Sequence, residues 1–218
     1  MNPRTPILAA LAALWLAAPS QAQDLVSFEN ALGNLRQQVL TAKAEQADAR
    51  SQALANDLQR LSFDIRNRVW DVQRQRNTFS DLRRRAQRMQ RKDKANQPGQ
   101  NNDPFFRNDL TRFVWDLQNF SRETERQRWE LDRIFREASA APELVNPVRM
   151  VQDALRDMSS QFQWLESDVR MGVWDIRRAG FSMEAWDIER EVGDLQREFR
   201  DLEDLCRRLL DKVQKPLN

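Results

Sequence analysis

The chain has no histidine, no tyrosine and a single cysteine. Histidine is the usual general base in catalysis and the most common ligand of transition metals, so its absence removes both roles. One cysteine allows neither a thiolate metal cluster, nor covalent haem attachment, nor an internal disulfide. Because the sequence also lacks a glycine-rich phosphate loop and a Gly-x-Ser-x-Gly nucleophile motif, we expect no metal, no cofactor and no enzymatic activity.

Acidic residues could still act in pairs as general acid and base, as they do in glycoside hydrolases. Almost every aspartate and glutamate of this chain, however, has an arginine nearby on the same helical face. This arrangement favours solvated ion pairs over catalytic carboxylates.

Glycine and proline are scarce, with five and eight residues, so the chain has few points at which it can turn. In the strongest break, NQPGQNNDP at 96–104, Asp103-Pro104 has the form of a helix cap followed by proline. Asn146-Pro147 repeats this form, and in AGFS at 179–182 Gly180 could end one helix and Ser182 cap the next. The breaks predict helices at about 25–95, 104–139, 147–179 and 182–215, with a division of the first near residue 62 left open.

Between the breaks, apolar residues recur at alternating steps of three and four, which is the pattern of a coiled-coil seam. No strand-like alternation appears, so we predict an all-α fold, an elongated antiparallel helical bundle or coiled-coil hairpins with long helices. Cys206 falls on the last seam and should be buried as a small apolar side chain. The seams comprise Leu110, Phe113, Leu117, Phe120, Thr124, Leu131 and Phe135; Val151, Leu155, Met158, Phe162, Leu165, Val169, Gly172, Ile176, Ala179 and Met183; and Ala185, Ile188, Val192, Leu195, Phe199, Leu202, Cys206, Leu209 and Val213.

The chain also contains a faint internal repeat of about 52 residues. NDLQRLSFDIR at 56–66 matches NDLTRFVWDLQ at 108–118, and DIRNRVWDVQR at 64–74 matches DVRMGVWDIRR at 168–178. Heptad patterning alone would align the aliphatic residues, whereas the shared Trp and Asp are more specific. We interpret the matches as three related helical units within one domain.

Residues 1–22 have the features of a secretory signal peptide. Arg4 precedes an apolar run from Ile7 to Ala18, and the small-x-small triplet Ser20-Gln21-Ala22 predicts cleavage after Ala22. Residues 23–218 would then form a single bundle domain, periplasmic or secreted, with no transmembrane segment and a formal net charge of +1 instead of +2, because only Arg4 is lost. An exported protein rarely meets nucleic acid, so we expect no nucleic-acid partner.

A Trp-Asp-aliphatic motif occurs four times, at Trp70, Trp115, Trp174 and Trp186. The first interpretation is packing, in which the indole covers the edge of the seam, the aspartate points outward to arginines one turn away, and the aliphatic residue enters the core. The second is an aromatic patch of Trp115, Trp174 and Trp186. These three would gather at one end of an up-and-down bundle and bind a partner or an apolar ligand.

Charge is unevenly distributed along the chain. Residues 54–95 have twelve Lys/Arg and five Asp/Glu, whereas residues 147–218 have twelve and fifteen. The basic excess could face solvent at a helix C-terminus, pair with the acidic last hairpin, or dock anionic envelope material or an acidic protein. The candidate basic patch comprises Arg83, Arg84, Arg85, Arg88, Arg91, Lys92 and Lys94.

The segment TAKAEQADARSQALAND, residues 41–57, has alanine and glutamine where the other seams have large side chains. It would pack thinly or pair with another subunit as a coiled coil. Together these features predict a non-enzymatic structural or adaptor component of the cell envelope that binds protein or self-associates through coiled-coil faces. A periplasmic holdase-type chaperone, binding unfolded clients or anionic envelope material, is the alternative.

Overall fold

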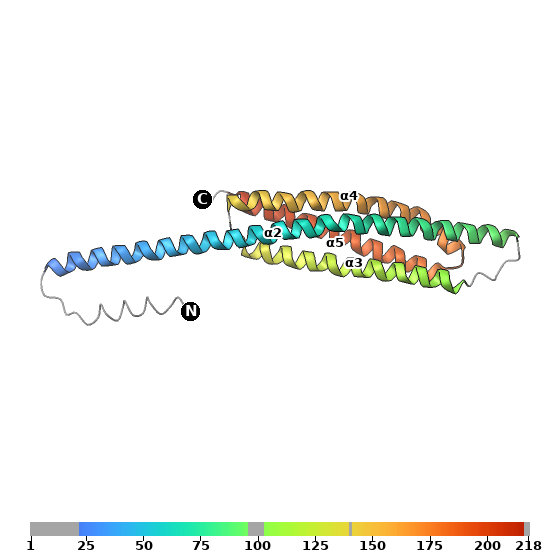
Figure 1. Ribbon diagram of the computed structural model, residues 1–218, viewed down its shortest axis with the longest axis horizontal. Helices are drawn as coiled ribbons and strands as arrows, with labels where there is room; N and C mark the ends of the chain where they lie inside the picture. Colours follow the sequence, from blue (N-terminus) through green and yellow to red (C-terminus); the bar gives the residue numbers. More distant parts are fainter. Residues whose placement is uncertain (1–21, 96–102, 140, 216–218) are drawn as a thin grey trace. The chain divides into compact units, whose positions relative to one another are not determined.

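The computed structural model describes residues 22–95, 103–139 and 141–215. In these ranges the chain forms four long helices and no strand: α2 (Ala22–Ala95), α3 (Pro104–Glu137), α4 (Pro142–Arg178) and α5 (Ser182–Gln214) (Figure 1). The predicted all-α bundle is confirmed. The predicted signal peptide, residues 1–22, lies outside the described residues apart from Ala22, and the internal repeat stays a prediction.

The chain divides into two units, residues 1–49 and residues 50–218. Helix α2 is continuous through residue 62, which answers the question of a break there. In the first unit, the side chains of residues 31–49 are exposed except for Ala31 and Leu35, which are half-buried. The helical bundle is in the second unit.

In the bundle, α2 lies between α3 and α4. Two ion pairs join it to α4, Arg76–Asp168 at 2.6 Å and Arg83–Asp175 at 2.9 Å, both 92 residues apart along the chain. A constant separation means that α2 and α4 are parallel. Arg68 bonds Glu123 of α3 at 2.8 Å, and pairs further along α2 meet earlier residues of α3, so those two helices are antiparallel.

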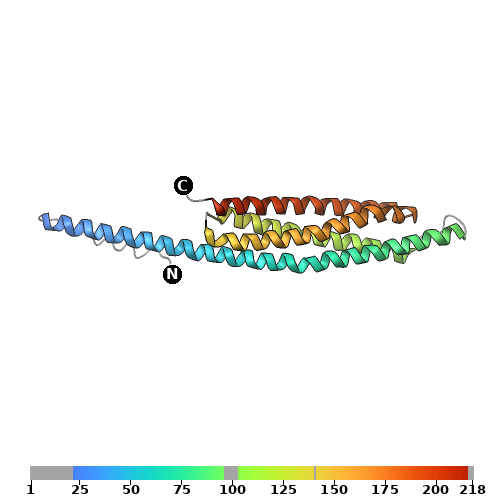
Figure 2. The same ribbon diagram turned by 90° about the horizontal axis from the view of Figure 1, so that it is seen from above.

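Helix α5 lies on the opposite side of the bundle and packs against both α3 and α4 (Figure 2). Arg107 bonds Glu184 at 2.9 Å and Arg128 bonds Asp201 at 3.3 Å, which makes α3 and α5 parallel. Gln196 bonds Glu166 of α4 at 2.9 Å in an antiparallel pair. The two hairpins α2–α3 and α4–α5 therefore lie side by side, so that α2 is next to the parallel helix α4 and α3 is next to the parallel helix α5.

The predicted seams form the core. All nine α5 positions from Ala185 to Val213 are buried, including Cys206, which is inaccessible. In the preceding seam Met183 is the exception, with 78% of its surface exposed. The chain turns after Arg178, so Met183 belongs to the first turn of α5 and no longer follows the α4 seam.

The α4–α5 turn differs by one residue from the prediction. Gly180 has a φ of 94°, the left-handed conformation that glycine adopts without strain. Phe181, not Ser182, is the residue before α5, and it forms no side-chain cap. Its ring is fully buried and meets Phe106 of α3 edge-on, with 5.0 Å between ring centres. The turn thus places an aromatic side chain in the end of the core.

Two proline-based helix starts had different outcomes. The Asp103 carboxylate accepts hydrogen bonds from the Phe105 and Phe106 amides, which confirms the predicted cap before Pro104. Helix α4 begins five residues earlier than predicted, at Pro142, and Pro147 lies buried inside it. Pro142 already occupies the first helical position, where a missing N–H costs nothing, so Asn146 is not needed as a cap.

Candidate interaction surfaces

Every tryptophan in the described part of the chain lies on the surface. The exposed fractions range from 54% to 71%. Tryptophan side chains are usually buried over most of their area, so a full set of exposed indoles is unusual. The set comprises Trp70, Trp115, Trp129, Trp164, Trp174 and Trp186.

Helix geometry explains why the Trp-Asp-aliphatic motif produces this result. In Trp174-Asp175-Ile176, Ile176 is fully buried. At 100° per residue, Asp175 lies on the flank of α4 and Trp174 lies 200° from Ile176, opposite the core. The Asp175 carboxylate accordingly accepts bonds from Arg83 and Gln87 of α2. The aliphatic residue is buried in all four motifs.

This order corrects the packing interpretation of the motif. We predicted that the indole would cover the seam edge and the aspartate would point outward. Instead Trp70 is 71% exposed and Asp71 is partly buried. The predicted pairing of Asp71 with an arginine one turn away is confirmed, because Arg74 lies 3.7 Å from its carboxylate. None of these tryptophans belongs to the core, so the aliphatic residue of the motif packs internally and the indole does not.

The predicted aromatic patch is partly assembled. Trp174 and Trp186 flank the α4–α5 turn, and the α3–α5 pairs place Trp115 at nearly the same level of the bundle as Trp186. The three indoles project from three different helices. Two are covered on one side by arginine, with Arg177 at 5.6 Å from Trp174 and Arg190 at 4.9 Å from Trp186.

The residues of the predicted basic patch do not form one surface, because some pair with neighbouring helices, one pairs within α2 and others are exposed. Arg83 pairs with Asp175 of α4 and Arg85 with Asp109 of α3, so both hold the bundle together. Arg84 pairs with Asp81 on its own helix. Arg88 and Arg91 are exposed, whereas the side chains of Lys92 and Lys94 lie outside the described residues.

Sequence reasoning missed a second group of exposed apolar residues, on α2 and α4. Phe63 and Trp70 are seven residues apart on α2, and Trp164 and Met171 are seven apart on α4. The signal was present, because two large apolar residues at a seven-residue spacing outside the main seam indicate a second helical face. We call these four residues the α2–α4 strip.

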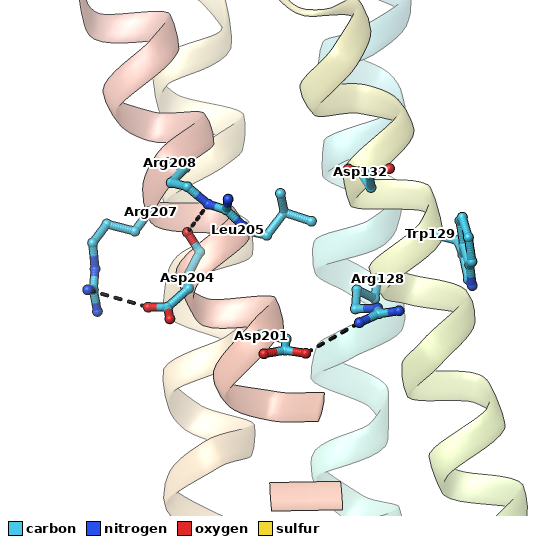
Figure 3. A pocket seen from close by; sticks show the side chains of 8 residues that line it. All are labelled: Arg128, Trp129, Asp132, Asp201, Asp204, Leu205, Arg207 and Arg208. Carbon is cyan, nitrogen blue, oxygen red and sulfur yellow. Dashed lines mark hydrogen bonds and ion pairs between the residues drawn. The ribbon is translucent and has the colours of Figure 1, made fainter. Parts of the chain in front are cut away.

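A groove between α3 and α5 has a volume of about 730 Å³ (Figure 3). Trp129 and Leu205 line it together with three arginines and three aspartates. Arg128 bonds Asp201 across it, and Arg207 pairs with Asp204. The three positive and three negative side chains leave this groove without net charge.

Two buried or partly buried titratable groups among the described residues, Cys206 and Glu198, have raised pKa values. Burial raises the pKa of the Cys206 thiol to about 12, which keeps it protonated and unreactive. Burial also raises the pKa of Glu198, whose Oε1 accepts a bond from Ser121 at 2.8 Å while Oε2 has no partner among the described residues.

Within the described ranges, no group of three acidic or cysteine side chains is arranged to hold a metal ion. No helix there combines the length and apolar character that a membrane span needs. Comparisons with protein-family models, curated proteins and solved structures find no match to this chain. The surface itself is therefore the basis for a functional assignment.

Proposed function

We propose that this protein is an exported, non-enzymatic helical bundle that binds another protein as a structural or adaptor component of the cell envelope. The observation that carries the proposal is the outward position of all six described tryptophans on a bundle whose core is complete without them. Export rests on the predicted signal peptide, and the non-enzymatic character on the missing histidines and motifs.

Exposed indoles are costly to a monomer, since each leaves a large apolar surface in water. Tryptophan and arginine are also the residues that contribute most to protein–protein binding energy. Arg76, Arg177 and Arg190 each stack on an exposed indole, so these pairs are already formed before a partner arrives. Because rigid helices hold the side chains at regular spacing, the surface fits a partner of fixed register.

One observation favours the holdase alternative. The indoles project from all four helices, so apolar and cationic groups occur on several sides of the bundle. A chaperone for unfolded clients would use such a distributed surface. An adaptor needs one or two faces only, and its partner would cover the same tryptophans in every complex.

The experiment that tests the proposal is covalent crosslinking of the tagged protein in intact cell envelopes, followed by purification and quantification of what is attached. We expect one partner at a fixed stoichiometry that persists in high salt. Many unrelated exported proteins, enriched when folding is stressed, would refute the adaptor and support the holdase. Recovery of anionic envelope glycolipid alone, released by salt, would refute both protein-binding functions.

A further inference from the structure

The α2–α4 strip lies on the face of the bundle that the parallel helices α2 and α4 form. Its four members, Phe63, Trp70, Trp164 and Met171, are between 56% and 71% exposed. Since residues of α2 lie level with those 92 positions later in α4, Phe63 lies level with residue 155. The strip therefore extends over sixteen residues, about 24 Å at the rise of an α-helix.

The two indoles of the strip lie along the boundary between α2 and α4. Trp70 of α2 lines a shallow hollow together with Asp157 and Gln161 of α4. Trp164 of α4 lies beside α2, because the guanidinium carbon of Arg76 is 5.6 Å from its ring centre. The groove between two parallel helices, with one indole from each, has the form that receives a third helix.

The border of the strip on α2 is strongly cationic. Between residues 59 and 91 the exposed side chains include six arginines and a single acid, Asp81. Arg74 and Arg84 pair with aspartates of their own helix, and the other four form no ion pair with any described residue. Those four are Arg60, Arg66, Arg88 and Arg91.

We infer that the α2–α4 face docks an amphipathic α-helix of a partner protein whose apolar seam is flanked by acidic residues. This inference rests on the proposed function, since it requires a protein partner. The seven-residue spacing on both helices matches the repeat of a helix seam, which a lipid surface does not impose. A second copy of this chain is disfavoured because arginines also outnumber acids among the exposed side chains of α3 and α5, eleven to four, and would repel the cationic border.

The test is site-specific photocrosslinking of the full chain in its own cells. Benzoylphenylalanine replaces Ser167, which is exposed on α4 between Trp164 and Met171. The control replaces Arg122, which is exposed on α3 and lies seven residues from both Trp115 and Trp129. Crosslinked segments are identified by mass spectrometry.

We expect the probe at position 167 to capture a segment with heptad apolar spacing and net negative charge. Trp70→Ala with Trp164→Ala should lower its yield at least tenfold, and Arg60→Glu with Arg66→Glu at least fivefold. The matched pair Trp115→Ala with Trp129→Ala should leave the yield within twofold. Circular dichroism melts of all variants should coincide within a few degrees, since only exposed side chains change.

Capture of lipid, of a second copy, or of a segment without acidic residues at position 167 would overturn the inference. An equal loss of yield in both tryptophan pairs would do the same. If position 122 captures a protein while position 167 captures none, the inference fails and the proposed function stands. If neither position captures a protein, the proposed function fails with it.

Discussion

Gly172 allows α2 and α4 to pack closely, and replacing it provides a sharp test of that packing. A Cβ atom at this position would lie 2.7 Å from Cε1 of Phe79 and 2.8 Å from Cδ of Arg83. The Arg83 side chain is flexible and can move. The Phe79 ring is fully buried, with its centre 5.7 Å from that of Phe113, so it has no free space into which to shift.

The expected size of the effect follows from two opposing terms. Overpacking a well-filled core costs about 1–3 kcal/mol. An alanine in place of a helical glycine recovers about 0.5–1 kcal/mol. Gly172→Ala should therefore lower the free energy of unfolding by up to about 2.5 kcal/mol.

Gly193 of α5 is the matched control, because a Cβ there would meet no atom within 4 Å. Gly193→Ala should raise the free energy of unfolding by about 0.5–1 kcal/mol, because alanine is the better helix former and nothing is overpacked. Since that term is common to both variants, the difference between them isolates the overpacking, about 1–3 kcal/mol.

Urea unfolding followed by circular dichroism measures both free energies of unfolding. Phe79→Leu added to Gly172→Ala should recover part of the loss, because the smaller side chain leaves room for the methyl group. Equal stability of the two alanine variants would refute the close contact between α2 and α4.

Three further outcomes follow from buried side chains. Phe181→Ala should lower the free energy of unfolding by about 3–5 kcal/mol, whereas Met183→Ala, two residues away and exposed, should change it by less than about 0.5 kcal/mol in the same urea titration. Cys206 should react with iodoacetamide at pH 8 only as fast as the protein unfolds, because its pKa is raised to about 12; rapid labelling without denaturant would contradict its burial. Glu198→Gln should be more stable than the natural protein at pH 7, with the gain vanishing near pH 4 in a series of unfolding curves. Because the pKa of Glu198 is higher in the folded state than in the unfolded state, the folded protein binds this proton at a higher pH. The charged carboxylate therefore destabilises the fold at pH values above the folded-state pKa, and this penalty is absent below the unfolded-state pKa. A gain independent of pH would assign the effect to shape instead of charge.

The helices and core were predictable because they depend on one repeating distance along the chain. The steps of three and four that placed Ile188, Leu195 and Cys206 on one seam are a property of the isolated helix, and all three are buried. The orientation of Trp174 and Asp175 was predicted in the wrong order. Whether the Trp or the Asp lies on the flank of the helix depends on the neighbouring helix, here on the Arg83 side chain of α2. The periodicity of α4 alone does not indicate where that neighbour lies.

For the candidate interaction surfaces, the sequence indicated which residues matter but not how they are arranged. The repeated tryptophans were recognisable as a surface or packing device, but only the arrangement of parallel helices shows that Trp70 and Trp164, 94 positions apart in sequence, both lie at the boundary between α2 and α4. For the arginine-rich run the sequence left open a solvent-facing helix end, pairing with the acidic last hairpin, or a docking patch; Arg83 pairs with Asp175 of that hairpin. Arg83 pairs with α4 and Arg85 with α3, because side chains two positions apart on a helix point in directions that differ by 200°.

The outward position of the tryptophans has an optical consequence. Indole fluorescence usually reports folding because the ring moves from a dry core into water. In this protein the six described indoles are already in contact with water in the native state, so the emission of the folded chain should closely resemble that of the unfolded one. A shift of the emission to shorter wavelength would then report a partner covering the surface, and not the formation of the core.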